Sequence, residues 1–261
     1  MYGRRGPRAV RGGRLRSWQA AVLGAVQGVA EVAPVSSSAQ LTLLPWLLGW
    51  PPPPDRTGFA AGLHAGSCAG IAWVLHPWHL DRRTTLLLAG TTVPAAVAGL
   101  ALADVVEARL GTPGPTAALL AGAGIVLWAA DRRPESHDVR VGDVAVAAVA
   151  QVIALAPGVS RSGATLTTLR ACGVNREQAL RFSLLMSLPV TAGAAALSLL
   201  RVRRPVPGVA VGAPVAGVTG ALAARLALRR ADTLMSEAAL YRLGLAAVVA
   251  VRLSRMRRTA P

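Results

Sequence analysis

Aromatic, acidic and cysteine residues are all scarce in this chain of 261 residues. Aromatic residues make up 4% of it, 12 residues are acidic, and every basic residue is arginine rather than lysine. Hydrophobic residues make up 53%, too large a share for one soluble domain of this size, so lipid must solvate much of the chain. Cys68 and Cys172 lie in or at the end of apolar runs, and they offer no disulfide framework.

The chain is strongly basic, with a formal net charge of +16. In a soluble protein this charge would suggest nucleic-acid binding, but these arginines lie mainly at the edges of apolar segments, as in membrane proteins. About 20 apolar residues in a helix cross a hydrocarbon core of about 30 Å. Six stretches approach or reach that length: 59–75, 84–103, 114–130, 183–200, 206–228 and 238–251. We therefore expect an all-α integral membrane protein without a nucleic-acid partner.

Two further apolar segments are interrupted in the middle by polar and small residues. Glu31, Pro34 and three consecutive serines break the segment 18–49. The run Pro-Gly-Val-Ser-Arg-Ser-Gly at 157–163 breaks the segment 142–171. Each segment predicts two half-helices joined by a polar turn, which in a bilayer form a re-entrant hairpin.

The two interrupted segments are related by a shift of 124 residues, which places Gln27 on Gln151 and Ser36 on Ser160. The similarity is weak, because alanine and glycine match by chance in such a composition. Broken segments in corresponding positions are nevertheless typical of two repeats with a binding site between them.

The number of spans between the hairpins predicts how the repeats are related. Three full spans lie between them, and an odd number of crossings inverts the second half. We therefore predict two inverted repeats, each a re-entrant hairpin plus three transmembrane helices, in a single membrane domain. A basic segment, 1–17, precedes the first repeat at 18–131, and the second repeat covers 142–255.

The arginine clusters help to predict how the protein is oriented in the membrane. Those at 4–16, 201–204 and 252–258 fall on one side of this arrangement. The positive-inside rule would make that side cytoplasmic. The arginine pairs at 82–83 and 132–133 favour the opposite orientation.

Glu31 lies near the middle of the first hairpin, where an ionisable group costs a few kcal/mol or more and needs a compensating partner. Arg161 is the only arginine of the second hairpin far from a membrane edge, and the repeat brings the two turns together. Two interpretations are open: an ion pair that only joins the two halves, or a functional pair.

The residues around this pair favour a function. Small residues expose backbone N–H groups, hydroxyls donate hydrogen bonds and half-helix N-termini add positive potential, which together form an anion site. A fixed guanidinium adds two parallel donors that match phosphate oxygens. The same hydroxyls would also cap the interrupted helices. The predicted phosphate-binding residues are Ser36, Ser38, Ser160, Ser162, Gly163 and Thr165, with Ser37 between the first two.

The two turns resemble the signatures of a known family. Residues 27–41 contain a Gln four residues before a Glu, then a proline and a serine-rich turn, and resemble the first signature of the undecaprenyl-diphosphate phosphatase family. This is the bacitracin-resistance type of membrane phosphatase. Residues 157–165 match the second signature nearly residue for residue, and the similarity extends over about 18–200.

The resemblance implies an enzyme of the bacterial cell membrane that hydrolyses undecaprenyl diphosphate to the monophosphate and phosphate. This reaction recycles the lipid carrier of peptidoglycan and other wall polymers. Carried over by position, Glu31 is the essential carboxylate, with Gln27 beside it, Ser37 is the nucleophile and Arg161 is the phosphate ligand. The family's divalent cation, Mg²⁺ or Ca²⁺, would bind at Glu31, and no organic cofactor is implied.

One position departs from the family pattern. The first signature usually ends in Gly-His, but this chain has Ala39-Gln40. A histidine moves protons near neutral pH and a glutamine amide does not. The histidine's work would then fall to Glu31, to a metal-bound water or to His64 in the first span, although His64 is also typical of a structural, hydrogen-bonded histidine.

Two other functions are compatible with the same pattern. Inverted repeats around broken helices could move polyprenyl phosphate across the membrane as a flippase. The replacement of the usual histidine by Gln40 makes this alternative more attractive. A catalytically weak paralogue could instead bind the lipid diphosphate without fast turnover.

Overall fold

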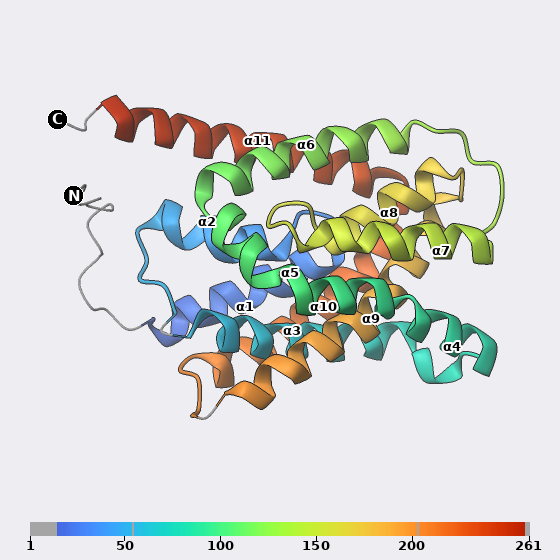
Figure 1. Ribbon diagram of the computed structural model, residues 1–261, viewed down its shortest axis with the longest axis horizontal. Coiled ribbons are helices and arrows are strands. Elements are labelled where there is room, and N and C mark those ends of the chain that lie inside the picture. Colours follow the sequence, from blue (N-terminus) through green and yellow to red (C-terminus); the bar gives the residue numbers. More distant parts are fainter. Residues whose placement is uncertain (1–14, 54, 203, 259–261) are drawn as a thin grey trace.

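The computed structural model describes residues 15–53, 55–202 and 204–258. Within these ranges all regular elements are helices, which confirms the predicted all-α class (Figure 1). Most of the predicted basic segment 1–17 lies outside the described residues.

Both predicted hairpins consist of two half-helices. The first is α1 (Ser17–Val32) and α2 (Ser37–Leu48), and the second is α7 (Val141–Ala150) and α8 (Arg161–Ala171). α7 continues as a short 3-10 helix, η2 (Gln151–Leu155). A proline follows the first half-helix in each case, and its missing N–H and fixed φ help to end the helix there.

The part of the chain that the structure describes contains six spans long and apolar enough to cross a membrane. They coincide with the six predicted stretches. The second span consists of two helices, α4 and α5, that meet at Thr91, and the 3-10 helix η1 precedes it. The elements are α3 (Arg56–Leu75), η1 (Pro77–His79), α4 (Arg82–Gly90), α5 (Thr92–Leu110), α6 (Pro113–Asp131), α9 (Arg176–Arg201), α10 (Val209–Arg229) and α11 (Ala231–Arg258).

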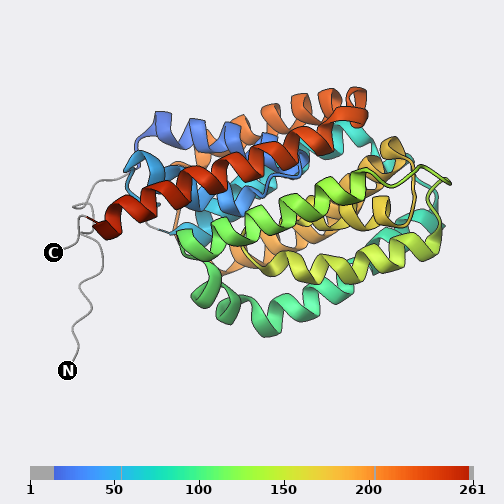
Figure 2. The same cartoon turned by 90° about the horizontal axis from the view of Figure 1, so that it is seen from above.

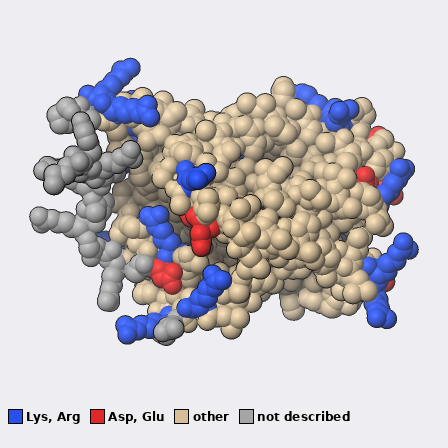
Figure 3. Space-filling view, in the orientation of Figure 1, with Lys and Arg blue, Asp and Glu red and all other residues tan. Residues whose placement is uncertain are grey.

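The helices run broadly along the long axis of the molecule (Figures 1 and 2). α1 starts at the end where α11 finishes, and α7 starts at the opposite end, so the two hairpins enter from opposite ends (Figure 1). On the face shown in Figure 3, most charged groups lie toward the two ends of this axis, with a broad uncharged band between them. The inverted relation between the halves and the boundaries 18–131 and 142–255 stay predictions.

Close helix packing fixes the position of α1. A Cβ at Gly24 would overlap the backbone of Gly212 in α10, and a Cβ at Gly28 would overlap that of Ala216. Small residues allow such close approach of helix backbones in a membrane. Val32, at the end of α1, belongs to the large buried apolar cluster that includes Leu166 of α8. The turn after α1 is thereby held against the second hairpin.

Candidate active site

The two polar turns meet inside the helical bundle, with Glu31 between them. Glu31 is the penultimate residue of α1 and is 4% exposed. Its Oε2 accepts a hydrogen bond from the Ser37 hydroxyl at 3.1 Å, and its Oε1 accepts one from the Arg161 guanidinium at 2.7 Å. The structure thus brings together the carboxylate and the guanidinium that the sequence places in separate hairpins.

Three further side chains surround the carboxylate. Gln27, one turn earlier in α1, donates its amide to Oε2 at 2.8 Å. The Thr191 hydroxyl of α9 lies 3.2 Å from Oε1, and the Nε2 of His64 in α3 lies 3.6 Å from Oε2. Sequence analysis missed Thr191, because a threonine within an apolar helix gives no distinctive pattern. Two spans, α3 and α9, and both hairpins therefore contribute side chains to the surroundings of one carboxylate.

The backbone fixes the protonation pattern of His64. Its Nδ1 lies 2.7 Å from the carbonyl oxygen of Ala60, one turn earlier in α3. A carbonyl only accepts hydrogen bonds, so Nδ1 carries a proton, and Nε2 is the nitrogen free to gain or lose one. Since Nε2 faces Glu31, His64 has the geometry of a proton acceptor beside the carboxylate.

The two turns start their second half-helices in the same way. Ser36 and Ser160 both have positive φ, 66° and 75°, a conformation that costs non-glycine residues about 1–3 kcal/mol. The Ser36 hydroxyl accepts from the amide of Ala39 at 3.4 Å, and the Ser160 hydroxyl accepts from the amide of Gly163 at 3.1 Å. Each serine is thus the N-cap of its helix, and the positive ends of α2 and α8 are aimed at the space beside Glu31.

The remaining predicted phosphate-binding residues differ in placement. The hydroxyls of Ser38 and Ser162 lie 3.2 Å from those of Ser36 and Ser160 respectively, and Ser38 is exposed. Thr165 is buried, and its hydroxyl lies 2.6 Å from that of Ser183 in α9. The structure therefore places Thr165 in the contact between α8 and α9.

Gln40 contacts the first turn and α11. Its Nε2 donates to the carbonyl of Val35 at 3.0 Å, and its Oε1 accepts from the Tyr241 hydroxyl at 2.7 Å. These bonds direct the amide to the turn backbone and engage both of its polar ends. Gln40 therefore supports the turn, and the side chain with proton-acceptor geometry at Glu31 is His64.

Arg242 of α11 was also not predicted from the sequence as a residue of the site. It is 0% exposed, and its Nε donates to the carbonyl of Pro34 in the first turn. A Cβ at Gly163 would overlap its terminal nitrogen Nη2, so the guanidinium also reaches the second turn. That nitrogen has no hydrogen-bond partner among the described residues. An arginine in the middle of the predicted span 238–251 was the available signal, since such residues mark functional sites in membrane proteins.

Several side chains around Glu31 are partly exposed. Glu31 is buried, whereas the side chains of Arg161 and His64 keep 18% and 22% of their surface exposed. Ser37 is half-buried and Ser38 is exposed. An anion that reaches these exposed groups would meet the Arg161 guanidinium and the Ser37 hydroxyl.

The protein itself offers few ligands for a divalent cation. Across the described ranges, no group of three or more His, Cys, Asp or Glu side chains gathers in one place. Both oxygens of Glu31 already accept hydrogen bonds, including one from the cationic Arg161. These residues do not fit a cation that stays bound without substrate.

Similarity to known proteins extends over nearly the whole chain. A family model described as bacitracin resistance protein BacA matches residues 20–248. The chain belongs to this family. The resemblance noted in the two turns is thereby confirmed.

Curated relatives of the chain carry one name. The undecaprenyl-diphosphatase of Gemmatimonas aurantiaca is 39% identical over 199 residues, 68% of this chain and 74% of the relative. That of Moorella thermoacetica is 37% identical over 255 residues, 88% of this chain and 95% of the relative. That of Thermomicrobium roseum is 35% identical over 249 residues, 81% and 88% of the two chains.

Proposed function

We propose that this protein hydrolyses undecaprenyl diphosphate in the bacterial membrane, yielding undecaprenyl phosphate and inorganic phosphate, and so recycles the lipid carrier for wall polymers. The single observation that carries the proposal is that the buried Glu31 accepts hydrogen bonds both from Ser37, at the N-terminus of α2, and from Arg161, at the N-terminus of α8. The name shared by the curated relatives supports the same substrate.

In this proposal the diphosphate binds between the two turns. One terminal nitrogen of Arg161 donates to Glu31, and the guanidinium has further N–H groups for phosphate oxygens. Arg242 adds positive charge from α11, and the N-termini of α2 and α8 add their partial charges. Phosphoryl transfer depends chiefly on positioning and on stabilising negative charge, which these groups provide in a largely dry site.

Ser37 is the proposed nucleophile. Its hydroxyl already donates to Glu31, so the proton passes to the carboxylate as Oγ forms a bond with the terminal phosphorus. The bond from that phosphorus to the bridging oxygen breaks, and undecaprenyl phosphate leaves. Water then attacks the phosphoserine, releases inorganic phosphate and restores the hydroxyl.

His64 is the proposed carrier of the proton. Its Nε2 lies 3.6 Å from Oε2 of Glu31, close enough to take the proton after a small movement or through one water. It can return that proton to the leaving oxygen. This assigns to α3 the role that the family pattern gives to the residue at Gln40.

A divalent cation, in this proposal, arrives with the substrate. Mg²⁺ is commonly held by one or two carboxylates together with substrate phosphates and water. Glu31 is the carboxylate available for such sharing. No step above depends on that ion.

The prenyl chain has an exit beside the first turn. An apolar pocket of about 370 Å³ lies between α1 and α11 and is lined by Val29, Ala33, Val35 and Tyr241, among others. Val29 and Tyr241 are exposed at its mouth. The first isoprene units would lie here, with the rest of the chain in the lipid.

The test is phosphate release from undecaprenyl diphosphate by purified protein, with Glu31→Gln as the inactive comparison and Ser38→Ala as the matched serine control. We expect release by the parent protein and by Ser38→Ala, and a loss of at least about a hundredfold in Glu31→Gln. Equal rates for the parent protein and Glu31→Gln would refute the proposal. Headgroup movement in proteoliposomes without phosphate release would point to transport instead.

A further inference from the structure

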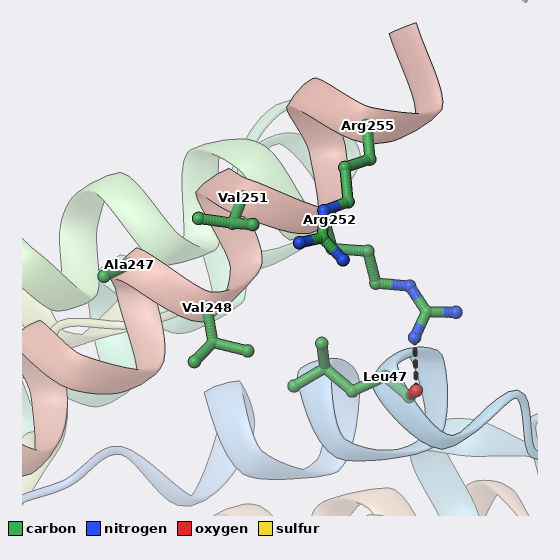
Figure 4. Close-up of a pocket in the computed structure, with 6 residues that line it drawn as sticks. All are labelled: Leu47, Ala247, Val248, Val251, Arg252 and Arg255. Atoms are coloured by element: carbon green, nitrogen blue, oxygen red, sulfur yellow. Dashed lines mark hydrogen bonds between the residues drawn. The ribbon is translucent and has the colours of Figure 1, made fainter. Parts of the chain in front are cut away.

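A second combination of arginines and apolar surface lies away from the site, at the end of the molecule where α11 finishes. A groove of about 670 Å³ separates the last turn of α2 from the C-terminal half of α11 (Figure 4). It is lined by Leu47 of α2 and by Ala247, Val248, Val251, Arg252 and Arg255 of α11. The volume is within the usual range for small-molecule sites, about 300–1,000 Å³.

Arg252 is held in place at the rim of this groove. Its guanidinium donates to the carbonyl of Leu47, as Figure 4 shows, and lies 4.9 Å from the centre of the Trp46 ring. These contacts fix the charge while leaving further N–H groups for an anion. Arg255 also lines the groove, so two arginines make its rim positive.

The remaining lining suits a hydrocarbon chain. Val248 and Val251 are 54% and 50% exposed on the outer surface of α11. In a membrane-spanning helix, such exposed aliphatic side chains contact lipid. The groove therefore joins an apolar floor to a cationic rim within one turn of helix.

Tryptophans place this rim at the membrane surface. Trp18 in the first turn of α1 packs edge-on against Trp50, just after α2, with ring centres 5.1 Å apart. Trp46 lies one turn earlier in α2. Tryptophan and arginine gather at the level of lipid headgroups, where the ring stays apolar on one side and wet on the other.

The groove is separate from the candidate active site. Leu47 is ten positions after Ser37 in α2, and Arg252 is ten positions after Arg242 in α11. At the helical rise this is about 15 Å along both helices. A diphosphate held between the turns therefore does not reach Arg252, and a phosphate at the rim belongs to another molecule.

We infer that this groove binds an anionic phospholipid, with its phosphodiester at Arg252 and one acyl chain along Val248 and Val251. The rim charge favours lipids with a net negative headgroup over zwitterionic ones that carry the same phosphate. The inference does not depend on the proposed hydrolysis.

The experiment is thermal unfolding of the purified full chain in a neutral detergent, titrated with phosphatidylglycerol or with phosphatidylcholine. We expect phosphatidylglycerol to raise the unfolding midpoint, and phosphatidylcholine to raise it much less. Arg252→Gln should weaken the apparent affinity for phosphatidylglycerol by about tenfold or more, since a charge-assisted hydrogen bond is lost. Arg83→Gln, at an exposed arginine of α4, is the matched control and should keep the parent response.

A second variant distinguishes loss of lipid binding from a structural effect of losing the hydrogen bond between Arg252 and Leu47. Val248→Trp fills the groove but keeps every arginine, and it should also remove the response to phosphatidylglycerol. The inference is overturned if the parent protein responds equally to both lipids, or if Arg252→Gln and Arg83→Gln behave alike. It is also overturned if Val248→Trp keeps the full response, or if that variant breaks up a dimer of the parent protein, which would make the groove a contact between copies.

Discussion

The first and second polar turns use one backbone arrangement for two different chemical tasks. In each, a serine with positive φ caps the helix through the amide three residues on, and its hydroxyl lies 3.2 Å from the serine two residues on. The residue between these serines differs: it is Ser37 in the first turn and Arg161 in the second. A shared scaffold therefore presents a hydroxyl to Glu31 from the first turn and a cation from the second.

The two turns also differ in what holds them. α11 supports the first turn from outside: Arg242 binds the carbonyl of Pro34, and Tyr241, through Gln40, binds that of Val35. The second turn instead packs against α6, where a Cβ at Gly158, which has φ of 107°, would overlap the backbone. Changes in α11 should therefore affect the first turn more than the second.

The largest expected effect comes from removing the cation of the second turn. Arg161→Gln leaves the buried Glu31 without its ion-pair partner, so we expect phosphate release to fall by about a thousandfold or more. Arg161→Lys keeps the charge but loses the forked geometry, and should retain more activity than the glutamine variant. Phosphate release, with elution volume as a folding control, tests this. Equal activity of Arg161→Gln and the parent protein would contradict it.

The next largest effect on turnover should distinguish two neighbouring serines of the first turn, Ser37 and Ser38. Ser37→Ala removes the hydroxyl bonded to Glu31, and we expect a loss of about a thousandfold in turnover. Ser38→Ala removes an exposed hydroxyl that lies 3.2 Å from that of the capping Ser36, and should cost about threefold or less. Rates of phosphate release from both variants make the comparison. Similar losses in the two would remove Ser37 from the role of nucleophile.

A smaller effect is expected at the two capping serines. Ser36→Ala and Ser160→Ala each lose a cap while keeping an unfavourable positive φ, and should lower the free energy of unfolding by about 0.5–2 kcal/mol. Ser36→Gly and Ser160→Gly should be less destabilising, because glycine adopts this backbone without strain. Unfolding in a mild detergent measures the difference. If the alanine variants are as stable as the parent protein, the hydroxyls are not caps.

The smallest effect is expected at Gln40. Gln40→His does not place an imidazole at the carboxylate unless the turn rearranges, so we predict no gain in phosphate release. Tyr241→Phe removes one hydrogen bond to Gln40 and should lower stability by about 0.5–1.5 kcal/mol. His64→Gln, which removes the imidazole 3.6 Å from Glu31, should instead lower turnover. A large gain of activity in Gln40→His would overturn the assignment of the proton carrier to His64.

Segment lengths and interruptions in the sequence were enough to predict the helices and the two hairpins. Long apolar runs have few alternatives in a bilayer, and Pro34 and Pro157 mark the breaks. Glu31 and Arg161 stood out because a charge within an apolar segment needs a partner. The predicted repeat implied that the two turns lie close together, and the structure gives the distances between their side chains.

Residues that reach the site from outside the hairpins were harder to predict. Thr191 is a small polar residue in an apolar helix, and its role depends on how α9 packs. Gln40 stands where the family pattern has a histidine, and no local pattern showed that its amide contacts the carbonyl of Val35 and the hydroxyl of Tyr241. Such contacts depend on tertiary packing over separations of up to 201 residues, which no local pattern contains.

A double-mutant cycle on phosphate release tests most directly whether both turns form one site. Glu31→Asp and Arg161→Lys keep their charges, so each should stay measurable while lowering turnover. If the two residues act on the same phosphate, the double variant should be clearly more active than the product of the two separate losses predicts. Losses that multiply within a factor of about two would show independent action and contradict the account.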